Sequence, residues 1–416
     1  MPETELFIEF EQPQEVFFPG QPISGRVILI TCEKYKARAV KIKFNGCAHT
    51  SWHEYESVAK TDSEGKTYYE QERVNYSGNV NYLQNSVLLW ACMDGSNELP
   101  PGSYVWPFSY VLSSNIPPSF EGKYGYIRYS VSAEVDRPWR FDKTSKRCIT
   151  VSPHLDLNAI PHAMTPLRDQ TSENLGCCCF KKGYLEMRVD IPKSGFVPGE
   201  TIPINLHILN KSTVPVTKVT AKVIQRCTFV SFRHGNSFDY IGETFRGSSR
   251  GETKRNSNMV IQQTQPLTVE PKKEQKLALE LRLPSVTPTI NQFSPIITVE
   301  YHVQVNVDTA STFGSEVESE MTVLIGTVPI HQYLPSINYP PNPGPVPFPI
   351  GSGVGIAPPP YPSAVQPSSP PPSYQDSVYG TEGTHLHVEE NEKPFVPKYP
   401  VFNNLPVYNP SAPPQD

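Results

Sequence analysis

Apolar and polar residues alternate one by one along most of the first 325 residues. In the run from Val40 to Ala48, Val40, Ile42 and Phe44 share one parity, and two lysines, an asparagine and a cysteine fill the other. A period of two predicts a β-strand with one buried face and one solvated face. Similar runs cover residues 104–112, 127–135, 185–191, 202–208, 277–283 and 297–307. No stretch shows helical spacing over three turns, so we expect an all-β protein built of antiparallel sandwiches.

The alternating pattern divides the chain into four parts. It is lost between residues 153 and 176, where prolines recur, and it resumes afterwards. We therefore expect a first immunoglobulin-like sandwich at residues 1–152, an interdomain linker at 153–176, a second sandwich at 177–326, and a proline-rich tail at 327–416. The tail contains 23 of the 45 prolines. It should be disordered, because it lacks the apolar residues needed to offset the entropy cost of ordering.

The two halves share a turn sequence and a strand. The segments 17–23 and 196–202 each contain Pro-Gly immediately before an alternating strand. Proline and glycine suit positions i+1 and i+2 of a type II turn, where glycine takes the positive φ that other residues resist. The strands around Tyr129 and Tyr301 match at a similar offset. This symmetric placement predicts a duplicated sandwich.

Charge and hydropathy narrow the class of protein. The formal net charge is −5; residues 1–326 hold 34 basic against 35 acidic side chains and the tail holds 2 against 6. This balance does not indicate nucleic-acid binding. The longest uninterrupted apolar run, Val87–Cys92, is too short to span a bilayer, and Met1–Glu5 lacks the features of a signal peptide. We expect a cytoplasmic protein with eight reduced cysteines.

Signatures of catalysis and cofactor binding are missing from the sequence. It contains no nucleotide-binding glycine loop, no His-Glu-x-x-His and no nucleophile elbow. We therefore expect no enzymatic activity and no cofactor. Cys47, His49 and His53 share one strand parity, but they fall on the face assigned to solvent and a fourth ligand is not evident. We expect a polar outer face there rather than a metal site.

Two clusters have alternative interpretations that the sequence leaves open. Cys177, Cys178 and Cys179 precede Lys181-Lys182. Three adjacent thiols cannot surround one tetrahedral ion, so the cluster is either a site of reversible palmitoylation beside a basic pair or an apolar plug at the domain junction. The basic stretch 137–147 fits either contact with anionic lipid or an exposed strand pair, and ordinary surface charge is the simpler account.

The tail contains two Pro-Pro-x-Tyr motifs within seventeen residues. Consecutive prolines favour the polyproline II helix, whose three-residue turn places the proline and the tyrosine of each motif on one face. WW domains bind such a face in an aromatic-lined groove. The predicted WW-binding residues are Pro358, Pro359, Tyr361, Pro371, Pro372 and Tyr374. A later segment, Tyr399–Phe402, fits a loose tyrosine sorting pattern and receives no assigned role.

These features together resemble the α-arrestins, the arrestin-domain-containing proteins. The residues that carry the resemblance are Phe17–Leu29, Asn115–Phe120, Cys177–Phe180 and Gly195–Glu200, together with the two tail motifs. The resemblance implies an adaptor whose body engages membrane receptors or transporters as cargo. Its tail would recruit WW-domain HECT-type ubiquitin ligases, promoting ubiquitination, endocytosis and endosomal sorting.

Such an adaptor would be recruited to the plasma membrane and endosomes by peripheral association. The first strand, Thr4–Glu11, is acidic where visual and β-arrestins carry paired lysines that sense receptor phosphate. Phosphate-triggered receptor binding is therefore not expected of this chain. The alternative function is a signalling scaffold that holds a WW-domain regulator through the same motifs.

Overall fold

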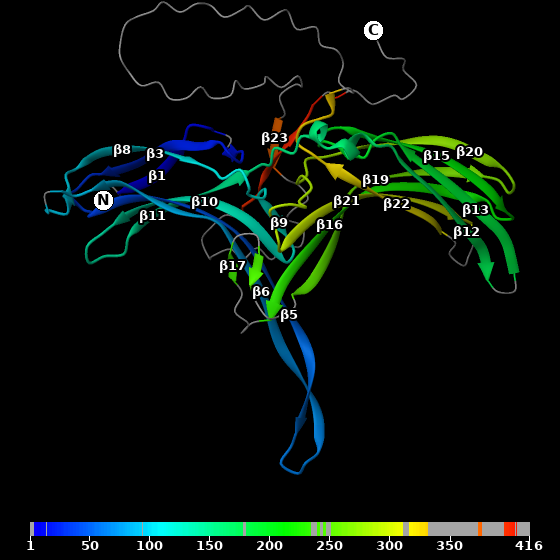
Figure 1. Cartoon of the computed structure of the whole chain (residues 1–416), viewed down its shortest axis with the longest axis horizontal. Coiled ribbons are helices and arrows are strands. Elements are labelled where there is room, and N and C mark those ends of the chain that lie inside the picture. Colours follow the sequence, from blue (N-terminus) through cyan, green and yellow to red (C-terminus); the bar gives the residue numbers. More distant parts are fainter. Residues whose placement is uncertain are drawn as a thin grey trace, which may run out of the picture.

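Two β-sandwiches lie end to end in the computed structural model, with a long hairpin projecting between them (Figure 1). The structure describes residues 4–13, 15–93, 95–177, 180–233, 239–241, 244–246, 251–310, 316–331, 373–376, 395–403 and 405. Apart from strands, this part of the chain contains two short 3₁₀ helices, η1 (Leu157–Ala159) and η2 (Pro161–Met164). The expected all-β fold is confirmed.

The first sandwich pairs a small sheet with part of a large one. The small sheet has the order β1 (Glu5–Phe10), β3 (Pro22–Thr31), β8 (Gly102–Val111). The facing strands are β2 (Val16–Phe17), β5 (Ala39–Thr61), β6 (Thr67–Ala91), β9 (Phe120–Gly122), β10 (Gly125–Asp136) and β11 (Lys143–Val151), and β4 (Tyr35–Lys36) pairs with β7 (Glu98–Leu99). Along β10 every second residue is buried, as the alternation predicted.

The second sandwich repeats this plan. A four-stranded sheet has the order β12 (Leu167–Cys177), β13 (Phe180–Ile191), β15 (Thr201–Ser212), β20 (Glu274–Arg282). It faces β14 (Gly195–Phe196), β16 (Val216–Arg233), β19 (Glu252–Val269), β21 (Ile297–Thr309) and β22 (Glu316–Ile325), and β17 (Asp239–Ile241) pairs with β18 (Thr244–Arg246). The two tail strands are β23 (Ser373–Asp376) and β24 (Lys398–Val401).

One large sheet runs through both sandwiches. The end of β16 pairs with β6, with Phe232 opposite Ser77. Beside this pairing, the hydroxyl of Thr50 donates to the carbonyl oxygen of Val230 at 2.7 Å, and the Ser231 hydroxyl donates to Thr50 at 2.8 Å. These buried polar groups satisfy one another across the boundary. The two sandwiches are therefore joined by sheet hydrogen bonds as well as by side-chain packing.

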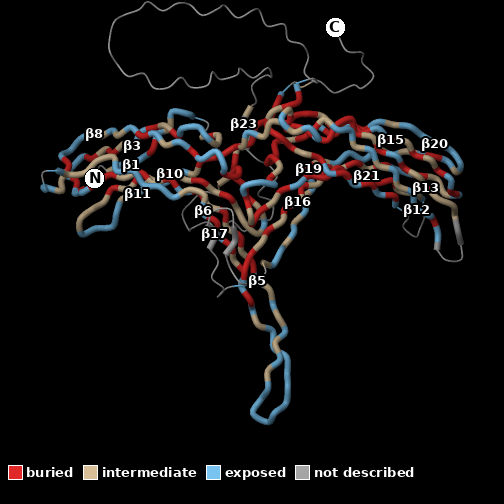
Figure 2. The backbone as a smooth tube through the Cα atoms, in the orientation of Figure 1, coloured by how far each residue is buried: buried red, intermediate tan, exposed pale blue. Residues whose placement is uncertain are grey.

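The β5–β6 hairpin extends far beyond the sandwiches (Figure 1). Its tip is exposed while its base is buried (Figure 2). At the tip the Gly65 amide donates to the carbonyl oxygen of Asp62 at 3.1 Å, and Gly65 has φ of 83°. A turn at Asp62–Gly65 thus closes the longest hairpin among the described strands.

Two local features occur at equivalent positions in both sandwiches, as expected for a duplicated domain. Gly20 and Gly199 have φ of 81° and 92°, and the residue after each donates to the carbonyl three residues back, at 3.0 Å in both turns. The predicted Pro-Gly turns are confirmed. In each sandwich a buried tyrosine hydroxyl also donates to a loop carbonyl: Tyr129 to Pro117 at 2.7 Å, and Tyr301 to Thr287 at 2.5 Å.

Two segments differ from the sequence-based expectation. The stretch 153–176, expected as a linker, contains η1, η2 and most of β12, which is the edge strand of the four-stranded sheet. Most residues of β12 are polar, so it lacks the alternation that marked the other strands. The tail was expected to be disordered, but residues 395–403 pack against the body. Tyr399, Val401 and Phe402 of this segment are buried there.

Candidate functional site

The tail segment 395–403 lies where the two sandwiches meet, on the side of the molecule opposite the β5–β6 hairpin (Figure 1). We call this place the seam; it is formed by Ser119 and Thr150 of the first sandwich and by Pro198, Gly199 and Ser285 of the second. Because both sandwiches contribute, the segment bridges them. It lies 70 residues or more along the chain from the last body strand.

Tyr399 is the centre of the tail contact. Its side chain is fully buried, and its hydroxyl donates to the carbonyl oxygen of Ser119 at 3.1 Å. The Ser285 hydroxyl donates to the carbonyl oxygen of Tyr399 at 3.4 Å, and the amide of Lys398 donates to the Thr150 hydroxyl at 3.1 Å. Burial raises the pKa of Tyr399, so the phenol is neutral in this state. Ring and backbone are thus held by both sandwiches.

Phe402 completes the contact on the second sandwich. Its amide donates to the carbonyl oxygen of Pro198 at 2.9 Å. Its buried ring belongs to a cluster with Leu157, Ala163, Val197 and Ile330. A methyl group at Gly199 would overlap the carbonyl of Phe402, whereas a methyl group at Gly20 would meet nothing within 4 Å. The second Pro-Gly turn therefore admits the tail because it lacks a side chain there.

A buried ion pair supports this second turn. The ammonium of Lys193 donates to the carboxylate of Glu200, which also accepts from the amide of Val197 at 3.1 Å. The ammonium lies 4.8 Å from the centre of the Phe196 ring. Burial lowers the pKa of Lys193 and raises the pKa of Glu200, and the attraction between the two charges opposes both effects.

Most residues of the predicted WW-binding motifs lie outside the described part of the chain. This holds for Pro358, Pro359, Tyr361, Pro371 and Pro372. The backbone of Tyr374 is placed, in β23, where it pairs with Pro400 of β24. The Tyr399–Phe402 pattern is visible in the sequence, but its loose form predicts no role for the segment. The signal available was a cluster of large apolar side chains in a tail otherwise rich in proline and polar residues.

The backbone of Cys177, the first of the three adjacent cysteines, lies in the β12–β13 hairpin of the second sandwich and not at the domain junction. Cys177 is the last residue of β12 and pairs with Phe180, the first residue of β13. The side chain of Cys177, and Cys178 and Cys179 altogether, are outside the described residues. The interpretation as an apolar plug assumed that the cysteines lie at the domain junction, and the position of Cys177 in the β12–β13 hairpin does not support that assumption. Whether these thiols carry lipid stays a prediction.

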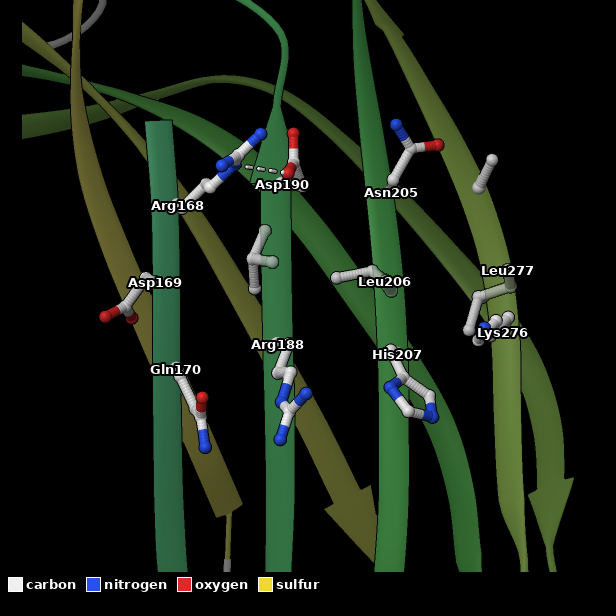
Figure 3. A pocket seen from close by; sticks show the side chains of 12 residues that line it. Arg168, Asp169, Gln170, Arg188, Asp190, Asn205, Leu206, His207, Lys276 and Leu277 are labelled. Carbon is white, nitrogen blue, oxygen red and sulfur yellow. Dashed lines mark hydrogen bonds and ion pairs between the residues drawn. The ribbon is translucent and has the colours of Figure 1, made fainter. Parts of the chain in front are cut away.

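The four-stranded sheet of the second sandwich presents a hollowed, charged outer face. Arg168, Arg188, Asp190 and His207 project from adjacent strands around a pocket of about 640 Å³ (Figure 3). Arg168 pairs with Asp190 at 2.9 Å and His207 with Glu274 at 3.0 Å. Because acidic and basic groups are interleaved here, the face suits a partner that presents both charges.

A second hollow, of about 750 Å³, lies at the base of the β5–β6 hairpin. His49 and His53 line it, and the Nδ1 of His49 lies 2.6 Å from the side-chain oxygen of Asn79. Burial raises the pKa of Cys47. Among the described residues, no group of three or more His, Cys, Asp or Glu side chains is arranged to hold a metal ion.

Two family descriptions match the chain across both sandwiches. The one for the arrestin (or S-antigen) N-terminal domain matches residues 6–158, and the one for the arrestin (or S-antigen) C-terminal domain matches residues 181–330. Arrestin domain-containing protein 17 of Caenorhabditis elegans is 27% identical over 326 residues, which cover 77% of this chain and 70% of that protein. The chain belongs to the α-arrestins.

Two further relatives support this placement. Arrestin domain-containing protein 4 of Mus musculus is 26% identical over 323 residues, covering 77% of this chain and 70% of that protein. Thioredoxin-interacting protein of Homo sapiens is 27% identical over 230 residues, covering 54% of each chain. The resemblance identified from the Pro-Gly turns and the tail motifs is therefore confirmed. Within the described residues, no helix is long and apolar enough to cross a membrane.

Proposed function

We propose that this α-arrestin is an adaptor, without catalytic activity, that links membrane-protein cargo to WW-domain HECT-type ubiquitin ligases and so promotes ubiquitination, endocytosis and endosomal sorting. The observation that carries the proposal is the pair of Pro-Pro-x-Tyr motifs on a chain whose body is an arrestin fold. The sandwiches and the hairpin supply exposed surface for cargo (Figure 2). The consecutive prolines of the tail favour the polyproline II conformation that WW domains bind.

The ligase half of the proposal is tested by capture of a tandem-WW fragment. Wild-type protein should bind it, and changing Tyr361 to alanine should weaken binding because the WW pocket that takes this ring is emptied. The double variant, with both Tyr361 and Tyr374 changed to alanine, should lose binding while keeping the thermal stability of the body, since both positions follow the two arrestin domains in the sequence. A double variant that binds like wild type would contradict the adaptor proposal.

The alternative scaffold would use the same motifs, so binding alone does not separate the two functions. An adaptor brings a ligase next to lysines of its cargo and of itself, whereas a scaffold for a WW-domain regulator does not. The chain should therefore gain ubiquitin when a WW-domain HECT ligase is supplied with its activating enzymes. Binding without any ubiquitin transfer would favour the scaffold.

We also propose that the protein is recruited to membranes from the cytoplasm through one end of the first sandwich. The β10–β11 turn there exposes Trp139 fully and Phe141 to 96%, and Met93 of a neighbouring loop is 95% exposed. Arg140 lies between the two rings in sequence. Aromatic side chains next to basic ones favour the headgroup region of an anionic bilayer, where each cation contributes about 1 kcal/mol.

Two interactions of Arg137 stabilise the conformation of the β10–β11 turn. The amide of Arg137 donates to the Asp142 carboxylate at 3.0 Å, and the Arg137 guanidinium lies 4.7 Å from the centre of the Tyr35 ring. Trp139 has φ of 61°, which a tight turn imposes. The two exposed rings are therefore presented by a fixed loop, and little conformational entropy is lost when they enter a lipid interface.

Vesicle binding tests the membrane proposal. Trp139 fluorescence should shift to shorter wavelength with phosphatidylserine-containing vesicles and much less with phosphatidylcholine alone. Trp139→Ser/Phe141→Ser should abolish co-sedimentation. The matched control is Tyr55→Ser, which removes an aromatic ring that is 64% exposed on the β5–β6 hairpin. Equal sedimentation of all three proteins would overturn the assignment of this turn.

A further inference from the structure

The second Pro-Pro-x-Tyr motif ends in a strand that pairs with the docked tail segment. In the β23–β24 pair, Tyr374 lies opposite Pro400 and Gln375 lies opposite Tyr399. The Ser373 hydroxyl donates to the carbonyl oxygen of Val401 at 3.2 Å and accepts from the side-chain amide of Asn403 at 3.0 Å. Residues 373–376 are therefore tied to β24, and β24 is tied to the seam.

This arrangement competes with WW binding. A WW domain must take the tyrosine and the prolines before it as one polyproline II ligand. In β23, however, Tyr374 has a strand neighbour about 4.8 Å away on one edge, and that neighbour lies against the body. A domain that encloses Tyr374 and the residues on both sides of it would collide with β24. WW binding at this motif therefore requires that β23 leave β24.

We propose that the seam is a binding site for an extended Tyr-Pro-Val-Phe segment, and that its occupation by residues 398–402 withholds the second Pro-Pro-x-Tyr motif from WW domains. The inference rests on the proposed function. The ligand chemistry is set by the contacts: a buried phenol donating to a carbonyl, a proline-containing extended backbone, and a terminal aromatic ring in an apolar cluster. Release of this segment makes the second motif available.

Gly199 offers a variant that acts on the seam without touching either motif. A methyl group at Gly199 would overlap the carbonyl of Phe402, so Gly199→Ala should expel the tail segment. Gly20→Ala is the matched control, because it places alanine at the same turn position with a similar positive φ and open space around it. Both variants bear the same backbone strain. Only Gly199→Ala should affect the tail.

Two measurements on the full chain follow the proposal. Trypsin cleavage after Lys398 reports docking directly, because this residue lies within β24 and its amide is bonded to Thr150. A single-WW fragment reports access to the second motif when the first is removed by Tyr361→Ala. The apparent affinity of a motif that is competent in only a fraction of molecules falls by that fraction.

In the Tyr361→Ala background, we expect at least tenfold weaker WW binding than to an isolated peptide of residues 366–379. Adding Gly199→Ala or Phe402→Ala should recover most of that affinity and expose Lys398 to trypsin; adding Gly20→Ala should change neither. Full peptide-like affinity in the Tyr361→Ala protein, or recovery by Gly20→Ala as well, would overturn the inference.

The proposed function fails by a different result. If WW domains do not recognise these motifs at all, neither the isolated peptide nor a Tyr374→Ala protein, which retains the first motif, will bind the fragment. If the Tyr374→Ala protein binds the WW fragment, and the Tyr361→Ala protein binds it as tightly as the isolated peptide does, the adaptor proposal stands. Only the proposal that the seam withholds the second motif is then contradicted.

Discussion

Lys193→Met should destabilise the second sandwich by about 3–5 kcal/mol, because it leaves the Glu200 carboxylate buried without its counter-ion. Both side chains are almost completely inaccessible to solvent. The carboxylate keeps one donor, the Val197 amide at 3.1 Å, which is not enough to replace an ammonium. The Phe196 ring beneath the ammonium would gain only an apolar neighbour.

The double variant Lys193→Met/Glu200→Gln provides the decisive comparison. Glutamine keeps an acceptor for Val197 while the buried charge disappears, so most of the lost stability should return and leave a deficit of about 1 kcal/mol. Chemical unfolding followed by circular dichroism gives the three free energies. A single Lys193→Met that costs less than about 1 kcal/mol, or a double variant no better than the single, would refute the argument.

The same pair predicts a pH dependence. In Glu200→Gln, Lys193 stays buried and loses the charge that supports its protonated form, so its folded-state pKa falls further below that of the unfolded chain. The folded state then binds fewer protons than the unfolded state between these two pKa values. Stability of this variant should therefore rise as the pH is raised from 7 towards 10, more steeply than that of wild type.

Three other expectations each concern one or two positions in the chain. Gly20→Val should cost about 1–3 kcal/mol from its φ of 81° alone, and Gly199→Val more, because its side chain also meets the tail; thermal unfolding compares them. Arg128→Ala leaves Glu121 buried without its partner at 2.5 Å and should cost about 3–5 kcal/mol by urea unfolding, with Arg128→Lys milder. Acyl-exchange labelling of Cys177–Cys179 should detect lipid, and absence of label would exclude it.

Much of the fold could be predicted because each buried strand repeats one simple rule. In β3, β10 and β15 a large apolar residue occurs at nearly every second position, and a two-residue period leaves no other structure with one dry face. The Pro-Gly turns were predictable for a similar reason, since local chemistry alone selects their geometry. The fold class and the duplication could therefore be predicted, because each short segment of the sequence independently indicates its own strand or turn.

The seam could not be predicted in this way. Tyr399–Phe402 is a four-residue segment whose partners, Ser119 and Pro198, lie hundreds of positions earlier. The two Pro-Gly turns have similar sequences, yet only the second is covered by a carbonyl of the tail. Edge strand β12 was missed because its mostly polar residues carry no alternation. Long-range pairing and edge strands leave no periodic trace in the sequence.

If the chain is an adaptor and the seam withholds the second motif, the strength of ligase capture depends on whether the seam is occupied. Tyr374 lies thirteen positions after Tyr361, a span of roughly 20 Å as a coil and about 40 Å as polyproline II. With the second motif withheld, a tandem-WW ligase binds through one module only. Once the tail leaves the seam, the second contact is intramolecular and avidity gains about 10²–10⁴.

Gly199→Ala should therefore strengthen capture of a tandem-WW fragment much more than capture of either single module by the otherwise unchanged protein. Surface-immobilised wild type, Gly199→Ala and Gly20→Ala provide the comparison, read as dissociation rates. Equal gains for single and tandem fragments would show that the tail weakens each site separately and does not control the number of contacts.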